Sequence, residues 1–251
     1  MLKDERLTQI VNLVNRRKTI CTEEIVKLLN ISPATVRRDL NELNQAGRLK
    51  KIYGGAKALN PIDYVTTEEG MGAKIQSHMK EKIAIAECAA QIIQDHDFIY
   101  LDAGTSVEAM LGFIQAGDLS FVTNSLTIAR ELSAMQYHVL TLPGEIKIST
   151  DSIVGIAAGD YLQRFNFTVG FFGTNGVHRD FGYTTPDINE ALVKEAAIAR
   201  CRKAYILADQ GKFGKVSQVT FCKDAGVPVV CDSRDENGML KARILTLEDL
   251  S

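Results

Sequence analysis

Short turns rich in glycine, hydroxyl, amide and charged side chains follow apolar runs in the C-terminal part of this 251-residue chain. Backbone N–H groups in a glycine turn at the start of a helix can cradle an anion, and lysines suit a phosphate. Carboxylates can accept hydrogen bonds from sugar hydroxyls. We therefore predict a site for a small phosphorylated sugar, formed by Asp102, Gly104, Thr105, Ser106, Thr123, Asn124, Asn175, Gly176, Thr185, Asp187, Glu190, Lys194, Asp209 and Lys212.

Alternating apolar runs and helical patterns would position these turns. The runs have the length of strands and are Phe98–Leu101, Phe121–Val122, Val139–Leu142, Val169–Phe172, Tyr205–Leu207 and Val229–Cys231. Helical patterns are Glu81–Ile93, Val107–Ile114, Ile128–Ala134, Ile153–Phe165 and Glu190–Cys201. This alternation predicts an α/β fold, a parallel sheet covered on both faces, in which ligands bind beyond the carboxyl ends of the strands.

Each turn taken alone is weak evidence for a site. Gly, Ser, Thr, Asn and Asp are common in any connection from a strand to a helix. Asp102 could merely cap a helix, and Lys194 could pair with Glu190 on a solvated helix face. The prediction therefore depends on the turns meeting at one edge of the sheet.

A second pattern, near the N-terminus, predicts a helix that enters a DNA groove. Ser32 can cap this helix, Pro33 fits its first position, and Gly47 offers a left-handed stop. An apolar stripe runs from Val36 to Leu43 and predicts the buried face. The opposite face presents small, hydroxyl and guanidinium groups, which suit a major groove.

A helix over Thr22–Leu29 should precede this one, with Thr22 as its cap and Asn30-Ile31 as the turn between the two. Arg6–Asn15 supplies a third helix. This spacing is typical of a helix-turn-helix, placed at about residues 20–39.

The stretch Arg48–Tyr53 alternates enough to form a strand, which Gly54-Gly55 ends, and we interpret it as a wing. The alternative is an ordinary three-helix surface with exposed arginines, but cap, turn spacing and wing would then coincide by accident. The predicted DNA-contacting residues of helix and wing are Ser32, Ala34, Thr35, Arg37, Arg38, Asn41, Lys50, Lys51 and Tyr53.

Charge divides the chain in the same way. Residues 1–58 hold 12 Lys and Arg against 6 Asp and Glu, and the rest holds 17 against 25, so a head of net charge +6 precedes a body of −8. A basic head is typical of a domain whose affinity comes from neutralising phosphates. We predict a winged helix-turn-helix over 3–58, a linker over 59–79 and a phosphosugar-sensing domain over 80–251.

Other function classes find little support in the composition. The five cysteines form no C-x-x-C pair and the four histidines show no ligand spacing, so we expect no metal, no disulfide and no cofactor. Cys88 and Cys201 are expected inside helices as small apolar residues. The chain has no apolar leader and no run of 18 apolar residues, which predicts a cytoplasmic protein without membrane contact.

The head resembles that of DeoR-family bacterial transcription regulators, with Tyr53 where many members carry His. The matching residues are Arg6-Leu7, Ile25, Ile31-Ser32, Thr35–Leu40 and Lys51–Ala56. The body resembles the sensor domain of that family, which is related in fold to ribose-5-phosphate isomerase and binds phosphorylated sugars. Its matching residues are Asp102-x-Gly104-Thr105-Ser106, Thr123-Asn124, Gly173-x-x-Gly176, Gly182–Ala191 with Lys194, and Ala208–Gly214.

Two departures from the family pattern bear on the ligand. Pro143-Gly144 stands where many members carry Gly-Gly, and Gln210-Gly211 stands where they carry Ser-Ser or His-Ser before the lysine. The stretch Tyr183–Asp187 is most similar to fructose-operon repressors of the family, followed by lactose/tagatose-phosphate repressors.

This resemblance implies a repressor of a sugar-utilisation operon, best matched to fructose, that binds operator DNA as a dimer or tetramer and is released by a phosphosugar such as fructose 1-phosphate. A lactose/tagatose-phosphate-responsive regulator and an activator use the same residues. A sugar-phosphate isomerase with a DNA-binding appendage is the enzymatic alternative, with Asp102, Asp187, Glu190 or Asp209 as general base. A fold relation does not confer activity, so we expect no enzyme.

Overall fold

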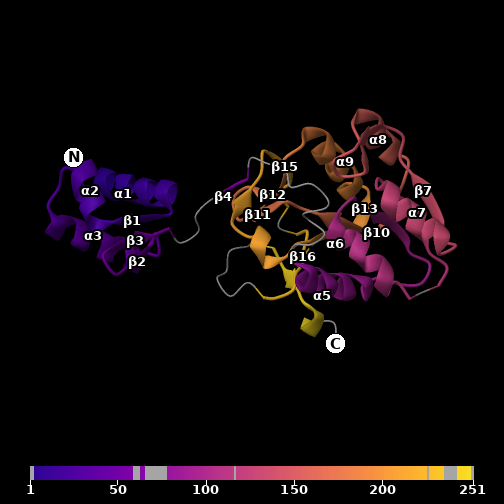
Figure 1. Cartoon of the computed structure of the whole chain (residues 1–251), viewed down its shortest axis with the longest axis horizontal. Coiled ribbons are helices and arrows are strands. Elements are labelled where there is room, and N and C mark those ends of the chain that lie inside the picture. Colours follow the sequence, from indigo (N-terminus) through magenta and orange to yellow (C-terminus); the bar gives the residue numbers. More distant parts are fainter. Residues whose placement is uncertain are drawn as a thin grey trace. The chain divides into compact units, whose positions relative to one another are not determined.

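The computed structural model describes residues 3–58, 63–65, 78–115, 117–224, 226–234 and 242–249. The chain forms two compact units, Met1–Asp63 and Tyr64–Ser251 (Figure 1). Residues 59–62 and 66–77 of the predicted linker lie outside the described residues, whereas Tyr64 and Val65 belong to the second unit. No described helix is long and apolar enough to cross a membrane.

The first unit is a winged helix-turn-helix. Its elements in chain order are α1 (Lys3–Arg17), β1 (Thr19–Cys21), α2 (Thr22–Leu29), α3 (Pro33–Gln45), β2 (Lys50–Ile52) and β3 (Gly55–Lys57). The strands form an antiparallel sheet in the order β1-β3-β2. The three helices and the sheet enclose a small core formed by Leu7, Ile10, Val14, Ile20, Ile25, Val36, Leu40, Leu43, Leu49, Ala56 and Ala58.

The termini of α3 are those that its sequence predicts. The Ser32 hydroxyl accepts a hydrogen bond from Thr35 N at 3.2 Å, and Pro33 occupies the first helical position. After the helix, Gly47 adopts a left-handed conformation with φ of 63°. Val36, Leu40 and Leu43 are buried, so the outward face of α3 is left to polar residues.

The predicted cap of α2 is wrong by one residue. Thr22 is the first residue of the helix, and Cys21 caps it with a backbone N–H that donates to the Glu24 carboxylate at 3.3 Å. Strand β1 extends through Cys21, so the helix begins only at Thr22, whose hydroxyl donates instead to Gly54 O at 3.1 Å. The side chain that was expected to cap α2 therefore fastens the turn of the wing.

The wing is packed tightly onto β1 at Gly55. A Cβ on Gly55 would lie 2.2 Å from Ile20 O and 2.9 Å from Cys21 Cα, both backbone atoms. Because real Cβ atoms do not approach backbone this closely, no other residue fits at this position without moving β1 from β3.

The second unit is built on a seven-stranded sheet in the order β17-β16-β13-β10-β5-β6-β7, with every neighbouring pair parallel. Its strands are β5 (Phe98–Leu101), β6 (Ser120–Thr123), β7 (His138–Thr141), β10 (Phe167–Gly173), β13 (Cys201–Leu207), β16 (Val229–Val230) and β17 (Ile244–Leu245). The predicted α/β class is confirmed, although β17 had no predicted counterpart.

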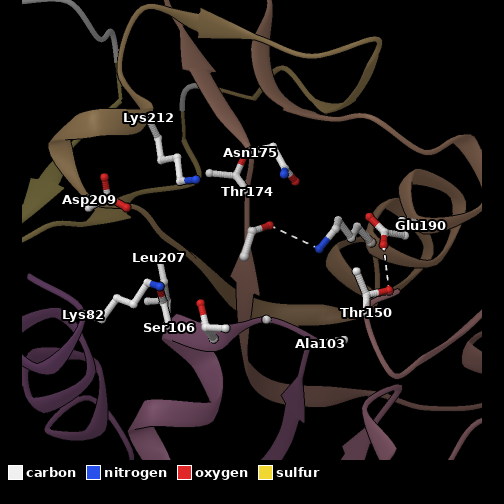
Figure 2. A pocket seen from close by; sticks show the side chains of 14 residues that line it. Lys82, Ala103, Ser106, Thr150, Thr174, Asn175, Glu190, Leu207, Asp209 and Lys212 are labelled. Carbon is white, nitrogen blue, oxygen red and sulfur yellow. Dashed lines mark hydrogen bonds between the residues drawn. The ribbon is translucent and has the colours of Figure 1, made fainter. Parts of the chain in front are cut away.

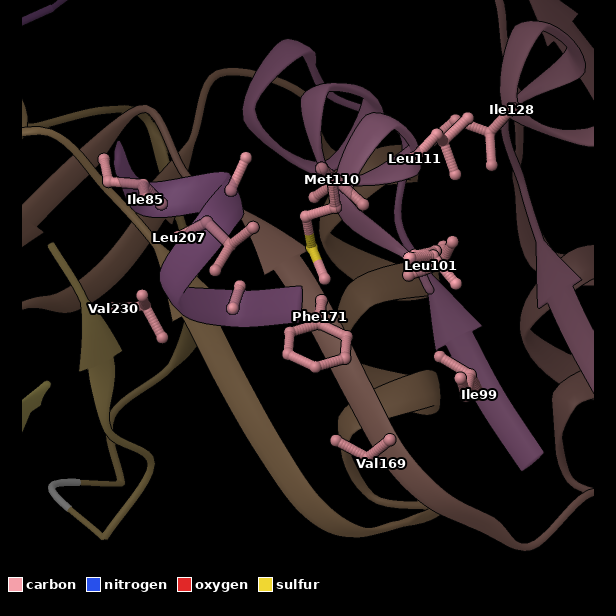
Figure 3. Close-up of a cluster of buried hydrophobic side chains, with 14 of the residues drawn as sticks. Ile85, Ile99, Leu101, Met110, Leu111, Ile128, Val169, Phe171, Leu207 and Val230 are labelled. Atoms are coloured by element: carbon pink, nitrogen blue, oxygen red, sulfur yellow. The ribbon is translucent and has the colours of Figure 1, made fainter. Parts of the chain in front are cut away.

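Helices cover both faces of this sheet (Figure 1). They are α5 (Met79–Ala90), α6 (Thr105–Glu108) with the 3-10 helix η1 (Ala109–Phe113), α7 (Leu126–Ala134), α8 (Ile156–Leu162) and α9 (Ile188–Ile198). Side chains of α5, α6, η1 and α7 pack with Leu101 and Phe171 in one buried cluster (Figure 3). Those of α8 and α9 pack on the other face with Tyr100 and Phe172, as the alternation of strand side chains requires.

Smaller groups of paired strands complete the unit. They are the sheet β11-β12-β15 (Gly176–His178, Gly182–Thr185, Val219–Cys222), the hairpin β8-β9 (Glu145–Lys147, Ser152–Val154), and β4 (Asp63–Tyr64) paired with β14 (Lys215–Val216). Two 3-10 helices are η2 (Gln210–Lys212) and η3 (Leu247–Asp249). These pieces follow the strand ends, where the predicted ligand residues lie.

Two predicted helices needed correction. Ile153 and Val154 belong to strand β9, because β-branched residues suit a strand and Gly155, with φ of 100°, separates them from α8. Cys201 is the first residue of β13 and pairs with Phe167, so it does not lie inside a helix. Cys201 nevertheless packs against apolar residues, as predicted. This burial raises the pKa of its thiol to about 12.

Candidate functional site

The first candidate site is the outward face of α3 with the adjoining wing. Most of the predicted DNA-contacting residues are exposed, namely Ser32, Ala34, Arg37, Arg38, Asn41, Lys50, Lys51 and Tyr53, and Thr35 is half-buried. Tyr53 has a relative exposure of 106% and stands at the tip of the wing, in the turn between β2 and β3. An aromatic ring so fully in water is costly, unless a partner covers it.

Two polar contacts hold this surface in place. Asp39, buried on the inner side of α3, receives Arg6 Nε at 2.7 Å and Arg6 Nη2 at 3.2 Å, so a two-pronged ion pair ties α3 to α1. Lys51 Nζ donates to Asn41 Oδ1 at 2.6 Å and connects the wing to α3. Helix and wing therefore present their side chains as one surface.

The second candidate site is a pocket in the second unit, at the carboxyl ends of β5, β10 and β13 (Figure 2). Figure 2 shows Lys82, Asp209 and Lys212 on one side of this pocket and Thr150 and Glu190 on the other. The pocket is lined by Lys82, Ala103, Gly104, Thr105, Ser106, Thr150, Gly173, Thr174, Asn175, Glu190, Lys194, Leu207, Asp209 and Lys212. The strand-end turns do meet at one edge of the sheet.

A buried ion pair forms the floor of the pocket. Lys194 Nζ contacts Asp102 Oδ2 and donates to Gly173 O at 3.2 Å, and Gly173 N donates to the same Asp102 oxygen at 2.9 Å. Burial raises the pKa of Asp102, against the opposing effect of the Lys194 ammonium. Neither of the simpler readings holds: Asp102 does not cap a helix, and Lys194 is 5% exposed instead of solvated.

Glu190 anchors the opposite wall. Its Oε1 accepts Lys147 Nζ at 2.9 Å and Thr150 Oγ1 at 3.2 Å, and its Oε2 accepts Thr185 Oγ1 at 2.8 Å. Burial opposes ionisation of Glu190, but the charges of Lys194 and Lys147 and these hydrogen bonds outweigh it and lower its pKa. Glu190 is therefore a carboxylate fixed in position by the hairpin β8-β9 and by β12.

Asp209, like Asp102, has one buried carboxylate oxygen without a hydrogen-bond partner among the described residues. It is 3% exposed, and its Oδ1 accepts no hydrogen bond within the described residues. A buried acceptor without a donor is costly, so a ligand hydroxyl or ammonium group at this point of the pocket would be stabilised.

Comparisons with known proteins identify both domains of the chain. The model of the DeoR-like helix-turn-helix domain matches residues 6–61, and that of the DeoR C terminal sensor domain matches residues 77–233. The chain belongs to the DeoR family. It is therefore a helix-turn-helix transcriptional regulator, as its sequence predicts.

Several DeoR-type relatives match almost end to end. The chain is 35% identical over 237 residues to the uncharacterized HTH-type transcriptional regulator FruR of Bacillus subtilis, covering 94% of this chain and 93% of the relative. It is 35% identical to a lactose phosphotransferase system repressor of Staphylococcus aureus, over 94% of each chain. Ribose 5-phosphate isomerase A of Methanocaldococcus jannaschii shares 12% identity and a TM-score of 0.42, over 55% of each chain.

The structure separates the residues predicted for the sensor-domain site into two groups. Gly104, Thr105, Ser106, Asn175, Glu190, Lys194, Asp209 and Lys212 line the pocket. The remaining ones are not among the lining residues and are Asp102, Thr123, Asn124, Gly176, Thr185 and Asp187. Among these, Asn124 Oδ1 accepts Ala103 N at 2.8 Å and so holds the first turn, and Thr123 Oγ1 accepts Ser125 N at 3.0 Å.

The other residues of the second group support the opposite wall. Asp187 caps α9 and pairs with Lys147 at 3.2 Å, while Thr185 binds Glu190. Burial opposes ionisation of Asp187, but hydrogen bonds from Glu190 N and Lys147 lower its pKa. A Cβ on Gly176 would lie 2.5 Å from Lys215 O, so this glycine permits a close backbone approach.

Sequence reasoning missed several lining residues, namely Lys82, Ala103, Thr150, Gly173, Thr174 and Leu207. Ala103 and Gly173 stand inside motifs that were recognised. Lys82 lies on α5, which follows no strand of the parallel sheet in the sequence, and Thr150 lies between β8 and β9. A search for polar residues after predicted strands therefore finds neither. Among the described residues, no cluster of His, Cys, Asp and Glu could hold a metal ion.

Proposed function

We propose that this protein represses transcription of a sugar-utilisation operon and leaves its operator when a phosphorylated sugar fills the pocket of the second unit. The observation that carries the proposal is a pocket lined by lysines, hydroxyls and carboxylates in the same chain as an exposed helix-turn-helix. The names of FruR and of the lactose phosphotransferase system repressors support a sugar-linked role.

The charges of the pocket suggest how such a ligand would lie. Its phosphate would bind near Ser106, between Lys82 and Lys212, because cations and a glycine turn stabilise phosphate oxygens. Its hydroxyls would extend to Asp209, Asn175 and Glu190, which offer carboxylate and amide groups. Fructose 1-phosphate is the ligand we favour, and tagatose 6-phosphate, in a lactose-responsive regulator, is the alternative.

The environment of the carboxylates favours binding over isomerase chemistry. Asp102 is held by Lys194, Asp187 caps α9, and Glu190 accepts three hydrogen bonds. A general base must instead be placed on a substrate proton. The contacts of these three carboxylates support the view that the pocket recognises a ligand.

The DNA-binding form would be a dimer or tetramer. A single recognition helix reads one half-site, and symmetric operators require two heads spaced by about one helical turn or a multiple of it. The predicted DNA-contacting residues, Ser32 through Tyr53, would then be presented twice to the operator.

Operator binding in the presence of sugars tests the proposal. Purified protein is titrated onto DNA upstream of its own operon, with fructose 1-phosphate, fructose 6-phosphate, tagatose 6-phosphate and the unphosphorylated sugars. We expect one phosphosugar alone to weaken binding. Lys212→Met and Thr105→Val should blunt this response and keep operator affinity, whereas Lys203→Met, at an exposed position of β13, serves as the matched control. Operator affinity unchanged at millimolar phosphosugar would refute the proposal.

A further inference from the structure

A segment of the second unit, Asp209–Val216, connects the pocket to the part of the chain that leads from the head. Two of its residues, Asp209 and Lys212, line the pocket. The segment continues through η2 and ends in β14. We call it the 209–216 segment.

Its C-terminal end holds the chain where the second unit begins. Tyr64 directly follows the first unit, and Val65 N donates to Val216 O at 2.9 Å. The Tyr64 ring meets Phe181 edge-on, with 6.5 Å between ring centroids. The chain therefore enters the second unit along β14, four residues beyond Lys212 of the pocket.

The segment also contacts the start of α5. His78 precedes α5 in a left-handed conformation with φ of 54°. A Cβ on Gly211 would lie 3.6 Å from both Cε1 and Nε2 of His78, so the imidazole lies beside this glycine. One helical turn later, Lys82 N donates to His78 O at 3.0 Å, and Lys82 lines the pocket.

The 209–216 segment is braced along its length. Lys212 N donates to Asp209 O at 3.0 Å, Phe213 N donates to Gln210 O at 3.1 Å, and Gly214 N donates to Val177 O at 2.9 Å. These hydrogen bonds fix the backbone of residues 209–214, so a short stretch of defined conformation joins Lys212 to Val216.

We propose that the 209–216 segment transmits the state of the pocket to the DNA-binding head. A ligand phosphate that draws Lys212 and Lys82 together moves Val216 and, through its hydrogen bond, Val65, which lies two residues beyond the first unit. The inference rests on the proposed function and adds to it the route by which ligand and operator affinity are coupled. By linkage, operator DNA must weaken ligand binding by the same factor.

Removing one hydrogen bond of this route tests it. Val65→Pro lacks the N–H that binds Val216 O, and Val65→Ala keeps it while losing the side chain. Operator affinity and phosphosugar affinity are measured for each, separately and together. We expect wild type and Val65→Ala to show a ligand-induced loss of operator affinity on the order of 5–150-fold. Val65→Pro should bind both partners normally, with the coupling reduced to about twofold or less.

A second pair of variants guards against misfolding of the proline variant. Tyr64→Ala removes the ring that meets Phe181, and Tyr64→Phe retains it. We expect Tyr64→Ala to weaken the coupling and Tyr64→Phe to leave it unchanged. If Val65→Pro and Tyr64→Ala both respond like wild type, the route is wrong although the proposed function stands. If wild type itself ignores every phosphosugar, the proposed function fails and this route fails with it.

Discussion

The surface of α3 and the pocket of the second unit differ in how their charged side chains are stabilised, by water in the first case and by other protein groups in the second. Arg37, Arg38 and Lys50 stand exposed, whereas Lys194 and Glu190 are buried in contacts with other charged groups. Exposed cations keep their hydration until a partner replaces it, and their interactions are screened by salt. Buried charges lose hydration on folding and must be compensated by their neighbours. Substitutions of the buried charges in the pocket should thus affect folding, and those of the exposed arginines on α3 should affect binding.

The largest expected effect comes from the pocket floor. Lys194→Met leaves Asp102 buried without its cation, which should lower the free energy of unfolding of the second unit by about 3–5 kcal/mol. Denaturant unfolding of the full chain, followed by tyrosine fluorescence, measures it. Glu195→Gln, on the exposed face of the same helix, is the control. A loss below about 0.5 kcal/mol, typical of surface substitutions, would show that the pair is not buried as described.

The next effect concerns affinity. Arg37→Ala and Arg38→Ala should each weaken operator binding, one of them by about 1–3 kcal/mol if it reads a guanine, and leave folding unchanged because both side chains are exposed. Operator titration at constant salt, with a thermal melt of each variant, separates the two quantities. A variant that melts early would mean that these arginines stabilise the head instead.

A smaller effect should appear in the salt dependence. Lys50→Gln and Lys51→Gln should each reduce the slope of log affinity against log salt by about 1, without changing base preference. Lys51→Gln also breaks the hydrogen bond from Lys51 to Asn41. Lys50→Gln is therefore the cleaner of the two tests of the wing. A changed base preference with an intact slope would contradict the placement of the wing against phosphates.

The smallest effect is a dependence on pH. The folded state lowers the pKa of Glu190, so its contribution to stability is present above the ordinary glutamate value of 4.5 and is lost as pH falls through the folded pKa. Glu190→Gln should flatten the acid side of the stability curve, measured by denaturant unfolding between about pH 3 and 6. If the stability of Glu190→Gln still falls with acid as that of the wild type does, the loss of stability belongs to other groups, such as Asp187.

Local sequence patterns predicted the elements of the head more completely than the residues that line the pocket. Ser32, Pro33 and the stripe Val36–Leu43 determine α3 within one stretch of chain, so cap, start and buried face could all be predicted. The exception, Thr22, followed from strand β1, whose pairing with the distant β3 extends it to Cys21. Long-range pairing of this kind leaves no local signal.

The pocket shows the same limit more strongly. Strand ends identified Gly104, Asn175 and Asp209, because parallel strands bring their carboxyl ends to one edge. The strand-end rule could not distinguish residues that line the pocket from residues such as Asn124 that hold its turns, since both follow strands. Lys82 reaches the pocket only through the packing of α5 on the sheet.

Gly55 has a consequence for genetics. A side chain at this position would collide with the backbone of Ile20 and Cys21, whatever its chemistry. A random screen for chains that no longer hold their operator should therefore recover nearly every amino-acid replacement of Gly55, as often as changes in the arginines of α3. Such alleles would map beside the DNA-reading residues although a glycine has no side chain to read a base.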